Sequence, residues 1–139
     1  MPLTKKFIQK IDNPEVISTI MKKWLSEDTV NSIFEKIELD KNYFISYFGL
    51  KILDYFILVL SEKAEIGNCP YIEKFLEFLE EKKVSVGDVF LICSALKKSI
   101  INFVLKDDEF SKQEKIELVN EIYRIFDLNL AGVLNRFVG

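Results

Sequence analysis

Residues 111–139 read SKQEKIELVNEIYRIFDLNLAGVLNRFVG, and this stretch decides the fold. Its apolar residues recur at alternating steps of three and four, which is the spacing of one face of an α-helix. They are Ile116, Val119, Tyr123, Phe126, Leu130, Val133 and Phe137. Ser111 and Glu114 stand at the spacing of a capping box, in which each side chain accepts a hydrogen bond from the backbone N–H of the other. The stretch therefore predicts a long helix over about 111–138.

A helical stripe of this length suits packing against a second copy of the chain. We predict a homodimer, in which the last helix also passes a signal to a downstream output domain. The predicted contact residues are Val119, Tyr123, Phe126, Leu130, Val133 and Phe137. Leu118, Ile122 and Ile125 form a second stripe, so the helix could instead be the last member of a closed bundle. Asn129 lies either on the exposed face or at a contact where it fixes the register of two chains.

The rest of the chain also has helical spacing, interrupted by a few prolines and glycines. The side chains that can cap the expected helix starts are in Asn13-Pro14, Ser26 to Thr29, Asp40 and Ser85. The longest apolar helix is expected over about 41–64. Gly67-Asn68-Cys69-Pro70 then indicates the end of one helix, followed by a new helix that Asn68 caps. No segment alternates as a strand would. Residues 1–139 are thus predicted to form one all-α domain, a bundle of six to seven helices without a sheet.

The composition is that of a folded domain: 49% of the 139 residues are hydrophobic, 29% are charged, and the net charge is −3. Lysines are interleaved with acidic residues, so we expect no nucleic-acid partner. The most apolar stretch, 43–60, contains Lys51 and Asp54, each costing about 2.5–3.5 kcal/mol at bilayer depth. We therefore expect no membrane insertion. Because the start of the chain has no export signal, we expect it in the cytoplasm.

The residue types exclude most catalytic chemistry. The chain has no histidine, which excludes His-ligated haem, His-based acid–base catalysis and Ser–His or Cys–His nucleophiles. Two cysteines are too few for a closed zinc site, and no Gly-rich phosphate loop is present. We expect a protein that is not an enzyme and that binds no haem or metal.

The aromatic residues of the helix over about 41–64 suggest a pocket for an apolar ligand. The predicted pocket residues are Tyr47, Phe48, Lys51 and Tyr55. Gly49 within the same helix permits close approach, and Lys51 would hold the carboxylate of an amphipathic ligand. Two alternatives stay open. One is that the aromatic rings are simply packed core, and the other is that Lys51 pairs with Asp54 on a solvated strip of the helix.

Cys69 is the candidate for redox chemistry. It lies in the first turn of a helix, where the positive end of the dipole would lower the pKa of its thiol. Cys93 lies on an apolar face and is expected to be a small buried hydrophobe. The sequence leaves open whether the two cysteines meet. A thiol-based redox sensor is therefore one alternative function, and a protein–protein interaction adaptor with a solid core is another.

Several segments together resemble the N-terminal sensor regions of bacterial signalling proteins, which precede diguanylate cyclase or histidine kinase domains. The pattern is similar to that of the haem-free, globin-like sensors of stressosome and sporulation-control proteins, and it covers nearly the whole chain. The segments are Trp24, the long aromatic helix, Gly67 to Pro70, Val89 to Cys93, Leu96 to Ser99 and Ile125 to Val133.

This resemblance implies a globin-like fold, dimerisation through helices and an apolar cavity where haem would sit, sometimes occupied by a fatty acid. Because the chain lacks a proximal histidine, gas sensing through haem is not implied, and no catalytic residue is carried over. The expectation is a cytoplasmic, non-enzymatic sensory or regulatory domain.

Overall fold

The computed structural model of the chain describes residues 2–67 and 69–138, with the side chains of residues 133, 134 and 136–138 left out. Over these residues the chain forms seven helices and no strand, which confirms the predicted all-α class and helix number. They are α1 (Leu3–Ile11), α2 (Pro14–Ser26), α3 (Asp28–Lys36), the continuous helix of α4 (Lys41–Phe44), η1 (Ile45–Gly49) and α5 (Leu50–Leu60), α6 (Pro70–Glu81), α7 (Val86–Lys106) and α8 (Lys112–Val138).

Most helix starts are fixed by the predicted side-chain caps. Asn13, Asp40 and Ser85 each accept a hydrogen bond from a first-turn N–H of the helix that follows. The capping box at α8 is reciprocal, with the Glu114 N–H 3.1 Å from Ser111 Oγ and the Ser111 N–H 2.9 Å from Glu114 Oε1. These local signals explain why the predicted and observed bounds of α8 nearly coincide.

The start of α6 differs from the prediction. Its cap is Cys69, whose Sγ accepts a hydrogen bond from the Ile72 N–H at 3.4 Å. Pro70 occupies the first turn as expected. The predicted cap, Asn68, lies outside the described residues.

Three helices end without the glycine that usually occupies the left-handed position after a helix. Glu38, Glu62 and Lys83 have φ of 58°, 60° and 59°. Each belongs to a Schellman motif, since the next residue donates to the carbonyl five residues earlier, as Lys63 does to Leu58. The long helix therefore ends at Leu60, before the predicted bound near residue 64.

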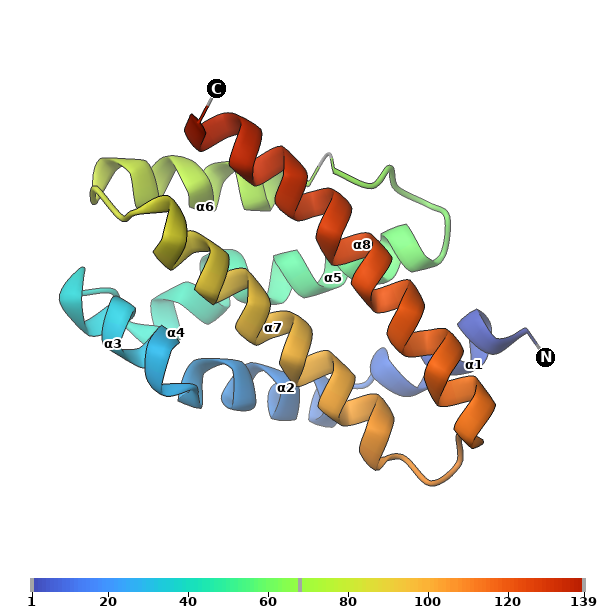
Figure 1. The fold of residues 1–139 in the computed structure, drawn as a ribbon. Coiled ribbons are helices and arrows are strands. Elements are labelled where there is room, and N and C mark those ends of the chain that lie inside the picture. The colour runs from blue at the N-terminus through green and yellow to red at the C-terminus, as the bar shows by residue number, and fades with distance from the viewer. Residues whose placement is uncertain (1, 68, 139) are drawn as a thin grey trace.

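The helices form two layers. The helices α7 and α8 run side by side in opposite directions across one face, and α2, α5 and α6 lie behind them (Figure 1). On α8, the second stripe of Leu118, Ile122 and Ile125 is buried against the core. One face of α8 therefore serves the domain itself, as the closed-bundle alternative expected.

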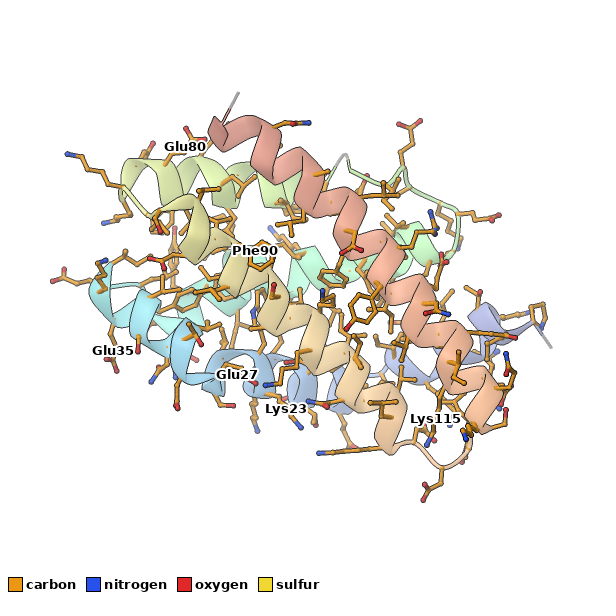
Figure 2. The ribbon with its side chains drawn as sticks, viewed as in Figure 1. Lys23, Glu27, Glu35, Glu80, Phe90 and Lys115 are labelled. Atoms are coloured by element: carbon orange, nitrogen blue, oxygen red, sulfur yellow. The ribbon has the colours of Figure 1, made fainter. Side chains whose placement is uncertain are left out.

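Ion pairs tie the first helix to the α7–α8 loop and to the first turn of α8. Lys10 Nζ lies 3.1 Å from Asp107 Oδ2, and Lys6 Nζ lies 3.2 Å from Glu114 Oε1. Lys115, beside the α7–α8 loop (Figure 2), donates to the Leu105 carbonyl oxygen at 2.8 Å. The first turn of α8 is thus fixed to its neighbours.

The helix Lys41–Leu60 is long and apolar enough to cross a membrane by length and composition. Half of that stretch is buried inside the fold, as in the core helix of a soluble protein. Lys51 and Asp54 lie on its exposed side. It is therefore accounted for as a core helix.

Candidate functional site

Trp24 lies at the centre of the packed layers. Its side chain is 2% exposed, and its indole N–H donates to the Ile92 carbonyl oxygen of α7 at 2.9 Å. The ring also meets Phe44 edge-on, with centroids 5.0 Å apart. Because both its ring and its polar atom are held, Trp24 is a fixed wall for the space beside it.

That space is an apolar void between the two layers, called here the inner cavity. It has a volume of about 50 Å³ and an almost wholly apolar lining. Apolar cavities of this kind stay dry, because a water molecule inside would lack hydrogen-bond partners. The lining residues are Trp24, Ile52, Ile72, Phe75, Leu76, Val89, Ile92, Cys93, Leu96, Phe126, Asn129 and Leu130.

The helix α8 closes one side of the inner cavity through Phe126, Asn129 and Leu130. The Phe126 ring also packs on Phe56 of α5, with centroids 5.5 Å apart. An occupant of the cavity would therefore touch α8 directly, and a shift of α8 would change the shape of the cavity.

A second hollow, called here the outer pocket, adjoins the inner cavity at the end of the α5–α6 loop. It has a volume of about 80 Å³ and shares Ile72, Leu76 and Asn129 with the inner cavity. Its other lining residues are Gly67, Cys69, Glu73 and Gly132. At the junction, Asn129 Oδ1 accepts a hydrogen bond from the Gly67 N–H at 2.9 Å, so α8 is tied to the loop.

A wider open groove of about 510 Å³ lies between α2, α7 and the α7–α8 loop. Lys23 (Figure 2) and Lys106 line it together with Asp107, Asp108 and Glu109. Charges of both signs line it, so the groove favours no single class of ligand.

None of the four predicted pocket residues lines the inner cavity. Tyr47 is 57% exposed and stacks on Tyr43, with centroids 4.4 Å apart. Phe48 is buried against Phe75, with centroids 5.1 Å apart, as the packed-core alternative expected.

Of the other two predicted pocket residues, both on α5, Lys51 is exposed and Tyr55 is half-buried. The Lys51 ammonium lies 5.3 Å from the centroid of the Tyr71 ring. The Tyr55 hydroxyl donates to the Glu65 carbonyl oxygen at 2.8 Å. Burial raises the pKa of Tyr55, with smaller effects from Cys69 and Glu65. The structure therefore does not bring the four residues together in one pocket.

The predicted contact stripe of α8 divides between core and surface. Val119, Phe126 and Leu130 pack partly against the core of the domain. Tyr123 is 45% exposed, and the Lys97 ammonium lies 4.4 Å from its ring centroid. The remaining two residues, Val133 and Phe137, lie outside the described side chains.

Both cysteines are free thiols next to the two hollows. For Cys69, burial raises the pKa and outweighs the N–H groups of Ile72 and Tyr71, so the predicted lowering is wrong. Burial raises the pKa of Cys93 to about 11. A protonated, buried thiol is a weak nucleophile, and the redox hypothesis gains no support from this geometry.

Within residues 2–67 and 69–138, no group of three or more Cys, Asp or Glu side chains is placed to hold a metal ion. Comparison of the chain with protein-family models, with curated proteins and with solved structures gave no match. The resemblance to globin-like sensors therefore stays a prediction from the pattern of residues.

Sequence reasoning missed the residues that form the inner cavity. They come from five helices, and only packing in three dimensions brings Trp24 and Leu96 to the same void as Leu130. One signal was present, because the single Trp and Cys93 both lie in segments that carried the resemblance.

Proposed function

We propose that this chain is a non-enzymatic, cytoplasmic sensory domain of a bacterial signalling protein, haem-free and globin-like, whose ligand site is the inner cavity. The observation that carries the proposal is the apolar void closed on one side by α8. The two free thiols fit a reducing compartment.

The output is a change in the packing of α8. Phe126 and Leu130 contact both the void and the core, so an occupant can favour one of two packings of this helix. The helix would pass that change to a downstream output domain. A ligand does this only to the extent that it binds one packing more tightly.

The free energy that the switch requires and the volume of the cavity together limit the size of the ligand. Moving a two-state equilibrium from 1:99 to 99:1 takes about 5.5 kcal/mol, and the best small ligands gain about 1.5 kcal/mol per non-hydrogen atom. At least about four such atoms are needed. A cavity of about 150 Å³ holds benzene, so the inner cavity, at about 50 Å³, is too small for a fatty acid unless α8 moves away.

We assign the partner surface to the outer face of α8, where a second copy of the chain would pack. Ile116 and Tyr123, seven residues apart on one side of the helix, are 47% and 45% exposed. Exposed apolar side chains at this spacing suit a helix–helix contact.

Xenon tests the ligand site, with the single Trp as reporter. Trp24 lines the inner cavity, and a heavy atom in contact with an indole quenches its fluorescence. We expect saturable quenching of Trp24 by xenon under pressure. Cys93→Leu, which fills the cavity, should abolish saturable quenching, and Cys93→Ala should keep it. Quenching that is absent, or equal in both variants, would remove the basis for the proposal.

A second candidate function is a protein–protein adaptor. It is favoured by a stripe of exposed residues on the α4–η1–α5 helix, with Tyr43 45%, Tyr47 57% and Leu50 42% exposed. An adaptor of this kind would use the stripe whether or not the cavity is filled. Loss of partner binding in Tyr47→Glu, together with no saturable xenon quenching, would favour it over the sensor.

A further inference from the structure

We propose, on the basis of the function proposed above, that the inner cavity and the outer pocket are two compartments of one site for a small neutral alcohol. The apolar body of the alcohol would lie in the two joined hollows, and its hydroxyl would lie between the Gly67 N–H and Asn129 Oδ1.

The two compartments meet at Asn129. Its side chain lines both hollows and accepts the hydrogen bond of the Gly67 N–H at 2.9 Å. Ile72 and Leu76 also line both, so the boundary is a narrow set of side chains from α6 and α8. A ligand that parts the contact between Gly67 and Asn129 would join the two volumes.

The chemistry of this contact selects a hydroxyl. The Gly67 N–H is a donor and Asn129 Oδ1 is an acceptor. A hydroxyl accepts from the first and donates to the second, as a bridging water does. A hydrocarbon can do neither, and a ketone can only accept. Insertion would also push α8 away from the α5–α6 loop, which is the movement that the sensor requires.

The surroundings disfavour a charged head group. The inner cavity is almost wholly apolar, and an ion there would lose its hydration without gaining a partner. Asn129 Oδ1, which lines the outer pocket, is an acceptor and has no hydrogen to donate to a carboxylate. Butyrate should therefore bind worse than 1-butanol, although their chains have similar length.

The size of the ligand follows from the two volumes. The inner cavity is about 50 Å³ and the outer pocket about 80 Å³. Together they approach the roughly 150 Å³ of a cavity that binds benzene. This space suits an alcohol of about four to six carbon atoms.

The test titrates the full chain with 1-butanol and follows the indole N–H signal of Trp24 by NMR. The chain has one Trp, so the signal is single. Asn129→Leu removes the polar contact, and we expect it to weaken 1-butanol binding about tenfold, as the loss of one hydrogen-bonded bridge would. Asn120→Leu makes the same exchange at an exposed position of α8 and should leave binding unchanged.

A second variant fills the outer pocket. Gly132 lines it, and a Cβ added there meets nothing within 4 Å. We expect Gly132→Leu to fold normally and to weaken 1-butanol binding about tenfold, while saturable xenon quenching of Trp24 persists.

The outcomes separate the two proposals. Equal 1-butanol affinity in the wild type, Asn129→Leu and Gly132→Leu, with xenon quenching intact, would overturn the two-compartment site and leave the inner cavity as the ligand site. Butyrate binding as tightly as 1-butanol would also overturn it. If neither xenon nor 1-butanol binds, the proposed function fails as well.

Discussion

Trp24 and Ile92, 68 residues apart in the chain, are joined by a buried hydrogen bond between two helices. The indole N–H of Trp24 in α2 donates to the Ile92 carbonyl oxygen in α7 at 2.9 Å. Both residues also line the inner cavity. The bond therefore joins the two layers at the wall of the inner cavity, where a change in packing would displace both residues.

Replacing Trp24 by Phe tests this relationship. The variant loses the N–H and part of the ring volume, so it loses one buried hydrogen bond and gains empty space beside the cavity. We expect the free energy of unfolding to fall by about 1–3 kcal/mol, measured by chemical denaturation followed by circular dichroism. Tyr47→Phe, at a residue that is 57% exposed, should change it little. An equally small decrease in the free energy of unfolding in both variants would show that the buried hydrogen bond does not stabilise the fold.

The parts of the fold that were predictable depend on residues close together in sequence. The reciprocal pair Ser111 and Glu114 fixed the start of α8, and Asn13 and Asp40 did the same for their helices. Periodicity then separated apolar from polar faces, and the stripe of Leu118, Ile122 and Ile125, which the sequence left open as a bundle face, is buried in the core.

The candidate site was not predictable, because a void is what remains after side chains from distant segments have packed. Periodicity showed that Phe126 and Leu130 share a face, but not that this face closes a cavity opposite Trp24. The pKa of Cys69 was mispredicted for the same reason. The helix start was visible in the sequence, whereas the burial that outweighs it was not.

The non-glycine helix ends predict stabilising substitutions. Glu62 has φ 60°, a conformation that costs an L-residue about 1–2 kcal/mol but suits glycine. Since glycine also makes the unfolded chain more flexible, we expect Glu62→Gly to raise the free energy of unfolding by about 0.5–1 kcal/mol. The neighbour Ser61 has φ −81°, so Ser61→Gly should bring no gain. Equal effects at both positions would contradict this explanation.

Gly49 should not tolerate a methyl group. A Cβ at this position would lie 3.1 Å from both Met21 Sδ and Phe44 Cε2. Phe44 is fully buried and packs edge-on against Trp24 and Phe34, so it cannot move aside. We expect Gly49→Ala to lower the free energy of unfolding by about 1–2 kcal/mol, because overpacking outweighs the gain in helix propensity.

The matched control for this substitution is Gly87→Ala. Gly87 lies in the first turn of α7, where a Cβ would meet only Ser85 Oγ at 3.8 Å. This variant should be neutral or more stable in thermal denaturation. Similar melting temperatures for the two variants would show that the space beside Gly49 is not limiting.

The ion pair between Lys10 and Asp107 predicts a pH dependence. Burial of Asp107 acts to raise its pKa, but the N–H of Glu109 and the ammonium of Lys10 outweigh it, so the pKa is lowered. A carboxyl with a lowered pKa stabilises the fold above its ordinary value of about 3.9 and loses that contribution as the pH falls.

We therefore expect Asp107→Asn to reduce the free energy of unfolding at pH 7 by about 1 kcal/mol or less. The difference from the wild type should shrink below about pH 4. Asp108→Asn, at the exposed neighbour, should have no such effect. A difference that is the same at pH 7 and pH 3 in denaturation experiments would rule out the charge as its source.

The proposed dimer predicts that the outer face of α8 controls the oligomeric state. Tyr123 and Ile116 are exposed on this face, whereas Phe126 is engaged with Phe56 inside the domain. A positive charge at Tyr123 would be buried in the contact beside the ammonium of Lys97, which lies 4.4 Å from the Tyr123 ring. We expect Tyr123→Lys to raise the dimer dissociation constant at least about tenfold without unfolding the chain, as measured by light scattering over a range of concentrations. Tyr47→Glu, on the helix of the opposite layer, should leave it unchanged. A wild-type chain that stays monomeric at every concentration would exclude this surface as a self-association site.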